Sequence, residues 1–406
     1  MKKSLKIILA VILAIVILTT TFLFGAFTGA SITGLRSILP SQTSGQAGNE
    51  LDYNRIENKL DKLKQIIDSN YLYDYDAQKM EDGIYKGYVA GLEDTYSQYY
   101  NADEYKALNE DQEGQFGGVG IEVSSANGQY IEVVAPIKGT PAERAGIRSG
   151  DRIIEINGES FTADQMQDAV KVMRGEPGQS VNLKVLRTVG NTDEQIDFEI
   201  VREIINVESI HSSMLEDKIG YIQITNFQAH TAEDFIKAYE DLKSKGAEKI
   251  VLDLRNNPGG LLDVTIQIAD YLLEEGPVMQ VKFKDGTDDS YNSKAGSEKL
   301  PMVTLINSGS ASASEVLSGG LKDYNRSEIV GETSFGKGVV QQVIPLADGD
   351  GVKVTIAEFF TPHGNKIHGE GIKPTKEVAL NENVTTIGPE NLSEDNQLQE
   401  AIKLLK

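Results

Sequence analysis

Two short apolar runs constrain the fold of this 406-residue chain most, because each leads through small residues into a helical pattern. The runs are IVLDL at 250–254 and MVTLI at 302–306. A strand that is apolar at almost every position is typical of a parallel sheet covered by helices on both faces. Since residues 218–380 alternate such strands with helices, we expect an α/β core there. In such cores, functional sites lie where strands end and loops begin.

Composition excludes several classes of function. The chain has no Cys, so it cannot use a thiolate nucleophile, a disulfide framework or a Cys-ligated metal. Its four His residues leave little material for a histidine metal site or a proton relay. The 61 acidic against 39 basic residues give a net charge of −22, which argues against binding nucleic acid through its phosphates. We therefore expect no cofactor, no metal and no nucleic acid.

The N-terminus carries a candidate membrane anchor. Residues 7–27 contain no charged side chain, and three lysines lie within residues 1–6. This length matches the ~20 residues that cross a bilayer core, and the preceding lysines favour a cytoplasmic N-terminus. We expect residues 1–6 in the cytoplasm, a single-pass transmembrane helix at 7–27, and the body of the protein outside the cell membrane. A cleaved signal peptide is the alternative, although residues 28–30 are a poor cleavage site.

Further segments surround the expected core. Residues 28–48 are rich in Ser, Gly and Gln and are typical of a flexible linker. Apolar residues then recur every three or four positions within 49–110, which predicts amphipathic helices. The apolar faces of these helices either pack on the same chain or form a dimer interface. A Tyr-rich stretch, DTYSQYYNADEY, occupies 94–105. The C-terminal tail, 381–406, is expected to be helical.

The stretch GGVGI at 117–121 is followed by SGDRIIEING, by a helical pattern at 163–173 and by a further strand. With these elements, residues 111–203 resemble a PDZ domain. Glycines allow backbone amides to converge on a peptide's terminal carboxylate, although a plain hairpin turn would explain GGVG alone. The strand from residue 121 and the helix would then flank a peptide that adds as an extra strand. The predicted peptide-binding residues are Gly118, Val119, Gly120 and Ile121.

A serine-rich turn follows the second apolar run. The sequence NSGSASASE at 307–315 ends a strand and begins a helix. Ser312 and Glu315 have the spacing of a capping box, so Ser312 could simply cap the helix. A serine at a helix start, however, also lies near backbone amides and the positive end of the helix dipole. Both would stabilise a developing oxyanion.

A glycine-flanked lysine lies farther along the chain, in GETSFGKG at 331–338. The pattern is close to a phosphate-binding loop, but Gly338 stands where the magnesium-binding hydroxyl belongs, so nucleotide binding is disfavoured. Lys337 lies among small and apolar residues, and burial there would lower its pKa. A neutral lysine amine can accept a proton from a serine, as in Ser-Lys proteases.

These motifs together resemble the carboxy-terminal processing proteases, also called tail-specific proteases. GSASASE is followed 25 residues later by Lys337 in GKG and then by Gln341, and LDLRNNPGG at 252–260 and TPHGNKIHGEGIKP at 361–374 belong to the same pattern. The resemblance covers the chain from near residue 50. Thr375 departs from it, because many members have Asp there. The resemblance implies an α/β protease core at 204–380 with an inserted PDZ-like domain and helical N- and C-terminal segments, and the uncharged run at 7–27 adds an N-terminal transmembrane helix.

The resemblance also implies a serine endopeptidase that binds unstructured protein C-termini and forms a homodimer through its terminal segments. It implies Ser312 as nucleophile, Lys337 as general base and Gln341 as the residue that orients the lysine. The oxyanion hole would use the amide of Ala313 with that of Gly259, in preference to Gly260. Arg174, at the end of the second PDZ helix, would contribute to a switch by which the PDZ domain gates the site.

Two alternatives remain at this stage. A Ser-His-Asp site would recruit His363 or His368, although neither lies in a motif with a partnered acid, and Asp323 is expected to be structural. The second alternative is a membrane-tethered PDZ scaffold that binds peptides without cleaving them. The presence of Ser312, Lys337 and Gln341 favours the enzyme.

Overall fold

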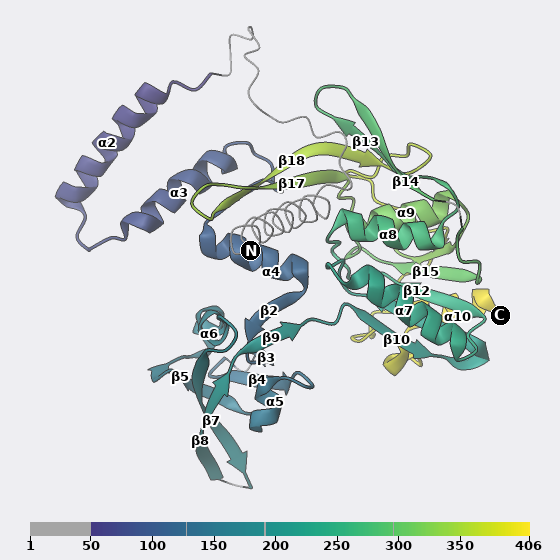
Figure 1. Ribbon diagram of the computed structural model, residues 1–406, viewed down its shortest axis with the longest axis horizontal. Coiled ribbons are helices and arrows are strands. Elements are labelled where there is room, and N and C mark those ends of the chain that lie inside the picture. Colours follow the sequence, from purple (N-terminus) through teal and green to yellow (C-terminus); the bar gives the residue numbers. More distant parts are fainter. Residues whose placement is uncertain (1–49, 127, 191, 295) are drawn as a thin grey trace, which may run out of the picture. The chain divides into compact units, whose positions relative to one another are not determined.

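The structure is a computed structural model, and it describes residues 50–126, 128–190, 192–294 and 296–406 (Figure 1). The predicted cytoplasmic residues, anchor and linker, at 1–6, 7–27 and 28–48, lie outside these ranges. Among the described residues, no helix is long and apolar enough to cross a membrane. The chain divides into two units, residues 1–75 and 76–406.

The described part of the first unit contains helix α2 (Tyr53–Asn70). Its N-cap is Asp52, whose carboxylate accepts the N–H of Arg55 at 3.0 Å. None of the residues of α2 is buried, and the apolar side chains of Leu63 and Ile66 are about half exposed. The amphipathic helix predicted here is therefore present, with its apolar face accessible.

The second unit contains a six-stranded sheet in which all neighbours are parallel except the first pair. Its strands, in spatial order, are β10 (Ile210–Met214), β11 (Ile219–Ile224), β12 (Lys249–Asp253), β15 (Met302–Ile306), β16 (Glu328–Gly331) and β19 (Lys376–Glu377). The strands β12 and β15 are the two apolar runs that the sequence singled out.

Helices cover both faces of this sheet (Figure 1). Successive residues of β12 alternate between two cores, because Leu252 packs in one apolar cluster and Val251 in another. Three helices contribute apolar side chains to the cluster of Leu252: α7 (Thr231–Ser244), α8 (Leu262–Leu272) and α9 (Ala313–Asp323). The helix α10 (Asn396–Leu405) contributes to the cluster of Val251. This confirms the predicted α/β core and explains why its central strands are apolar on both sides.

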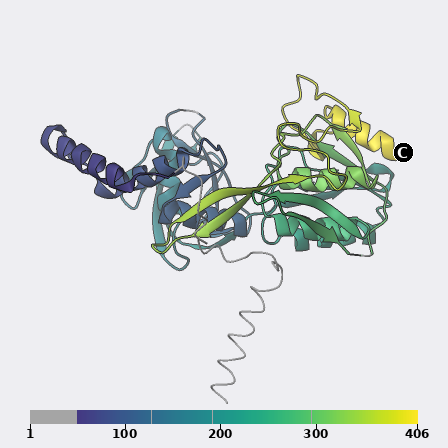
Figure 2. The same ribbon diagram turned by 90° about the horizontal axis from the view of Figure 1, so that it is seen from above.

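A second, five-stranded sheet is antiparallel. It consists of β1 (Gln98–Tyr100), β13 (Gly276–Phe283), β14 (Asp288–Ser293), β17 (Val339–Pro345) and β18 (Gly351–Phe360). Figure 2 shows the β17–β18 hairpin, in light green, as a long ribbon. The strand β1 lies between α3 (Ala77–Ala90) and α4 (Ala102–Glu113), so the segment expected to be helical also supplies a strand to this sheet.

The PDZ domain has a core of its own and is inserted between α4 and β10. The chain enters it through β2 (Gln115–Gly118) and leaves through β9 (Glu203–Asn206), and these two strands pair with each other. Its sheet has the order β3 (Ile121–Ser124), β4 (Ile131–Pro136), β5 (Arg152–Ile156), β7 (Ser180–Val189) and β8 (Thr192–Val201), with β6 (Glu159–Ser160) beside β5. The helices are α5 (Pro141–Ala145), the 3-10 turn η1 (Ala163–Gln165) and α6 (Met166–Met173).

The C-terminal tail contains two further elements, η3 (Pro389–Asn391) and α10, and a short 3-10 turn, η2 (Glu216–Lys218), precedes β11. Within α10 the apolar residues Leu398, Ala401 and Leu405 pack against the sheet of the same chain. The predicted tail helix therefore uses its apolar face to cover the protease core.

Candidate active site

Three loops meet at one edge of the parallel sheet. They follow the neighbouring strands β12, β15 and β16 and comprise residues 254–261, 307–312 and 332–338. Because neighbouring parallel strands end at the same edge, the glycine turn, the serine turn and the lysine loop are brought together.

Hydrogen bonds fasten the serine turn to the loop after β12. Ser310 and Ser314 are fully buried, and their hydroxyls donate to the carbonyls of Leu254 (2.8 Å) and Asn257 (2.9 Å). Ser312, in contrast, is only partly buried. Of the three neighbouring serines, Ser312 is therefore the one accessible to a substrate.

The backbone of Ser312 is strained. Its φ is 55°, in the left-handed region that non-glycine residues rarely adopt and that is enriched at functional sites. The residue is the N-cap of α9, and the Glu315 carboxylate accepts its N–H at 2.8 Å, as in the predicted capping box. Ala313 is the first helical residue, so its N–H has no acceptor within the helix and lies at the positive end of the dipole.

The glycine turn lies directly against Ser312. A Cβ atom on Gly259 would stand 2.9 Å from Ser312 Cβ and 3.0 Å from the nitrogen of Ala313, so only glycine fits here. A Cβ on Gly260 would instead meet the carbonyl of Phe227 at 2.2 Å. The N–H of Gly259 donates to Asn257 Oδ1 at 2.9 Å. As an oxyanion donor, Gly259 would have to share this hydrogen bond or release it.

Glu315 joins the serine turn to the lysine loop. Its side chain is fully buried, and each oxygen accepts two hydrogen bonds. Oε1 binds the Ser334 hydroxyl (2.6 Å) and the Gly336 N–H (2.7 Å), whereas Oε2 binds the N–H groups of Ser312 and Lys337, both at 2.8 Å. The sequence suggested only a local helix cap for this residue, because the spacing of a capping box does not reveal contacts with a distant loop.

Lys337 has the environment expected of a neutral base. Burial lowers the pKa of its ammonium group, and the positive charge of Lys353 lowers it further, while Asp94 and Glu315 oppose the change. Its Nζ lies 4.9 Å from the centroid of the Tyr96 ring. Within the described ranges, no hydrogen bond links Nζ to a neighbouring side chain. A desolvated amine of this kind can accept a proton.

Gln341 lies on β17, four residues beyond Lys337 and opposite Thr355 of β18. Its side-chain Nε2 donates to the carbonyl of Val339 at 3.1 Å and lies 3.5 Å from Thr355 Oγ1. In the part of the chain that the structure describes, Gln341 makes no hydrogen bond to Lys337. Its expected orienting role stays a prediction.

Among the described residues, no hydrogen bond joins a histidine to Ser312, and His368 Nδ1 has no partner, so the histidines do not form a Ser-His-Asp site. The Nδ1 atom of His363 lies 3.8 Å from the Asp323 carboxylate. The backbone N–H of His363 donates to the same carboxylate at 2.8 Å. Asp323 ends α9, whereas Ser312 precedes it, and a rise of ~1.5 Å per residue separates them by about 16 Å. The ring of His368 lies near Tyr96, with 6.3 Å between centroids. Asp323 thus holds the loop that contains His363.

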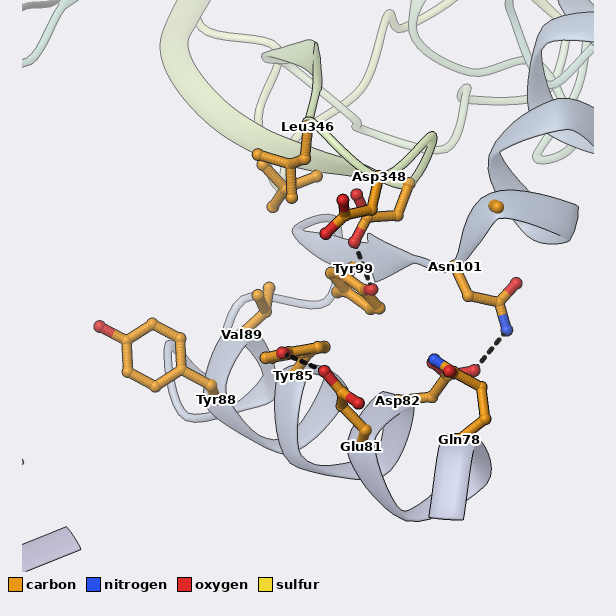
Figure 3. A pocket seen from close by; sticks show the side chains of 13 residues that line it. Gln78, Glu81, Asp82, Tyr85, Tyr88, Val89, Tyr99, Asn101, Leu346 and Asp348 are labelled. Carbon is orange, nitrogen blue, oxygen red and sulfur yellow. Dashed lines mark hydrogen bonds between the residues drawn. The ribbon is translucent and has the colours of Figure 1, made fainter. Parts of the chain in front are cut away.

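A cavity of about 480 Å³ lies at the opposite end of the β17–β18 hairpin from Lys337. Figure 3 shows its polar lining: the Tyr99 hydroxyl donates to Asp350 (2.5 Å), and the Asn101 amide donates to Asp82 (2.7 Å). None of the predicted site residues lines this cavity. Across the described residues, no group of three or more His, Asp or Glu side chains is arranged to hold a metal.

The predicted peptide-binding loop connects β2 to β3. Gly118 ends β2, Ile121 begins β3, and Val119 is buried in the PDZ core. Gly120 has φ 78°, and a Cβ there would lie 2.4 Å from Thr140, so the loop needs glycine. Among the described residues, β3 is the edge strand of the PDZ sheet and pairs with β4 alone, so its outer edge is available to an added strand.

Arg174 lies at the C-cap of α6. Its guanidinium lies 4.3 Å from the ring centroid of Phe116 in β2 and 3.9 Å from the carboxylate of Glu110 in α4. These contacts link the PDZ helix to the segments that connect the domain to the core. Both charged groups are partly exposed, so the ion pair itself contributes little stability.

A buried ionic network, which the sequence did not predict, lies behind the glycine turn. Arg255 is fully buried, and its guanidinium donates to Asp253 of β12 and to Asp395, the N-cap of α10. It also donates to Gln397 at 3.0 Å. The network ties the C-terminal tail to the residues immediately before the glycine turn.

Comparisons with known proteins agree with this geometry. The family model for peptidase family S41 matches residues 218–378, and a PDZ domain model matches residues 132–187. Carboxy-terminal processing protease CtpA of Bacillus subtilis (strain 168) is 37% identical over 94% of this chain and 78% of its own length. CtpB of the same organism is 38% identical over 82% of this chain and 69% of its own length.

Among solved structures, a putative S41 protease from Bacteroides fragilis NCTC 9343 shares the fold, with a TM-score of 0.52 and 16% identity. That likeness covers 83% of this chain and 92% of the other. The fold, the site and the relatives together define a serine peptidase with a PDZ domain. This chain belongs to the S41 family of carboxy-terminal processing proteases, and the resemblance found in the sequence is confirmed.

Proposed function

We propose that this protein cleaves peptide bonds with a Ser312–Lys337 dyad and recognises unstructured protein C-termini through its PDZ domain. The observation that carries the proposal is the buried Glu315 carboxylate, which binds the backbone N–H groups of both Ser312 and Lys337. A partly exposed, strained serine and a desolvated lysine are thereby held on adjoining loops.

The reaction begins when the neutral Lys337 amine accepts the proton of Ser312 Oγ as this oxygen attacks the substrate carbonyl. The Ala313 N–H, with that of Gly259, stabilises the negative charge that develops on the carbonyl oxygen. The Lys337 ammonium then returns its proton to the nitrogen of the departing fragment as the C–N bond breaks. Finally, Lys337 takes a proton from the water that attacks the acyl-enzyme, and it returns this proton to Ser312 Oγ as the ester bond breaks, which regenerates the serine hydroxyl and the neutral amine.

The PDZ domain would capture the substrate. An extended peptide would add to the free edge of β3, with its terminal carboxylate at the backbone amides of residues 118–121. Arg174 joins α6 to Glu110 and Phe116 near the entry to this domain. We therefore assign Arg174 to the coupling between peptide docking and the protease core.

The proposed setting is the outer face of the cell membrane, with residues 7–27 as a single-pass anchor. We also propose a homodimer formed through residues 49–110 and the tail. Support comes from the apolar side chains of α3, since Met80 and Ile84 are each 44% exposed. In the tail, α10 is already packed on its own core, so residues outside that apolar face would make the contact.

The test is to incubate the full-length protein, in detergent micelles, with an unfolded protein that ends in apolar residues and to map the cuts by mass spectrometry. Wild type should cut, Ser312→Ala should not, and Ser244→Ala, at an exposed serine, should behave as wild type. Binding without cutting by the wild type would favour the scaffold alternative. Cutting by Ser312→Ala would remove the proposed nucleophile.

A further inference from the structure

The Tyr-rich stretch contributes a short segment to the active site, although it lies far from Ser312 and Lys337 in sequence. Residues 94–97 precede β1 and run beside β18. The Thr355 N–H of β18 donates to the Ser97 hydroxyl at 3.0 Å. The strand β1 then pairs with residues 351–353, so the segment is fastened along the hairpin that begins just after Lys337.

A local turn fixes the position of Tyr96 within this segment. The Asp94 carboxylate accepts the Tyr96 N–H at 3.0 Å and the Ser97 hydroxyl at 2.6 Å. Ser97 is buried, and its oxygen both donates to Asp94 and accepts from Thr355. The backbone on both sides of Tyr96 is thus held in place.

The Tyr96 ring faces the Lys337 amine. The Lys337 Nζ lies 4.9 Å from the ring centroid, within the range of a cation–π contact. The His368 ring is a further neighbour of Tyr96, in a T-shaped arrangement with 6.3 Å between the ring centroids. An aromatic ring in this position keeps water away from the amine. The ring face offers no conventional hydrogen bonds in place of those that the water would make.

We propose that Tyr96 is a positioning residue for the Lys337 base, covering Nζ against water and holding it at the foot of the β17–β18 hairpin. This inference rests on the proposed function, because it assumes that Lys337 is the base. It assigns a role to residues 94–97, which lie outside the sequence motifs around Ser312 and Lys337.

The charges around Lys337 determine the expected direction of the effect. Lys353 on β18 disfavours the ammonium form, whereas Asp94 and the buried Glu315 favour it, and His368 is a further titratable neighbour. The ring itself attracts an ammonium group. Burial is nevertheless the largest influence on the pKa of Lys337 and lowers it. Opening the site to water should therefore stabilise the ammonium form and reduce the neutral fraction at neutral pH.

The first test is the dependence of kcat/KM on pH for a peptide substrate. Tyr96→Phe should match wild type, because the ring remains. Tyr96→Ala should lose about tenfold in kcat/KM at pH 7 and recover as the pH rises, since more of the lysine becomes neutral. The matched control is Tyr100→Ala, which removes a similar ring that lies 5.3 Å from the Nζ of Lys353. This variant should have the same dependence of kcat/KM on pH as wild type.

The second test does not require catalysis. Lysines of the Ser312→Ala protein are methylated with a carbon-13 label, and the Lys337 signal, assigned by its absence in Lys337→Arg, is titrated by NMR. Adding Tyr96→Ala should move this titration to higher pH, whereas Tyr100→Ala should not. If Tyr96→Ala does not fold, Tyr96→Gln gives the same comparison, because a polar side chain admits water.

Three results would overturn the inference: an unchanged Lys337 titration in Tyr96→Ala, an equal loss of activity at every pH, or faster hydrolysis than wild type. The last would mean that the ring restrains the lysine in an unproductive position. Persistent hydrolysis by Ser312→Ala would instead refute the proposed dyad, and the NMR titration would still report whether Tyr96 covers Lys337.

Discussion

Replacing Glu315 by glutamine should weaken the contact between the serine turn and the lysine loop. Glutamine has nearly the same shape, but one of its two acceptor oxygens becomes an NH₂ group that cannot accept. In the better orientation, this group faces Ser334 and Gly336. The Ser334 hydroxyl can turn and accept, whereas the Gly336 N–H loses its partner.

The magnitude follows from these contacts. A buried, unsatisfied N–H costs about 1–3 kcal/mol, and each of the two hydrogen bonds that change from a charged to a neutral acceptor loses about 1 kcal/mol. We therefore expect Glu315→Gln to lower the free energy of unfolding of the core by about 3–5 kcal/mol. A displacement of the reacting groups by about 1 Å should reduce kcat/KM roughly 100-fold.

The assay combines urea unfolding, followed by circular dichroism, with peptide hydrolysis under conditions where the variant is folded. Glu233→Gln, at an exposed position in the first turn of α7, is the matched control and should change stability by less than about 0.5 kcal/mol. Wild-type stability and activity in Glu315→Gln would refute the role of this carboxylate as the link between the two loops.

Three further predictions concern the base and the tail. Lys337→Arg should abolish hydrolysis, because arginine stays charged, and measurable activity would point to another base. The wild-type rate should rise with pH through an apparent pKa below the ~10.4 of an ordinary lysine, and a rate that falls as pH rises would contradict a neutral amine. Asp395→Asn should lower the free energy of unfolding by about 3–5 kcal/mol, because it leaves Arg255 short of a buried charge partner, and a near-neutral effect in urea unfolding would show that the network is dispensable.

The pH dependence of the tail follows from the same network. Burial raises the pKa of Asp395, but the hydrogen bonds and charge of Arg255 outweigh this and hold it below its ordinary value. A carboxylate with a lowered pKa contributes stability above the ~3.9 of the unfolded state and loses it as the pH falls through the folded value. Lowering the pH through the folded-state pKa of Asp395 should therefore destabilise the packing of α10.

The α/β core and the PDZ domain could be predicted because their signals are local. A strand such as IVLDL carries its burial on both faces in its own sequence, and the glycine in the β2–β3 loop is required by a contact within the same domain. The residue types at Ser312 and Lys337 likewise indicated the chemistry. The comparisons then confirmed the family.

The parts that escaped prediction depend on contacts between distant segments. Glu315 has the pattern of a helix cap, and nothing in that pattern reveals its hydrogen bonds to Gly336 and Lys337. Asp395 reaches Arg255 across 140 residues, and Tyr96 reaches Lys337 only because β1 joins the hairpin sheet. Such pairings are set by topology, which residue spacing does not encode.

The most direct measurement of the central claim is the detection of the acyl-enzyme. A peptide ester is mixed with the protein, the reaction is quenched in acid within the burst phase, and the modified fragment is identified by mass spectrometry. The account predicts an added acyl group on Ser312 in the wild type, none in Ser312→Ala, and little in Lys337→Arg. An acyl group on Ser310 or Ser314, or full acylation of Ser312 in Lys337→Arg, would contradict the Ser312–Lys337 dyad.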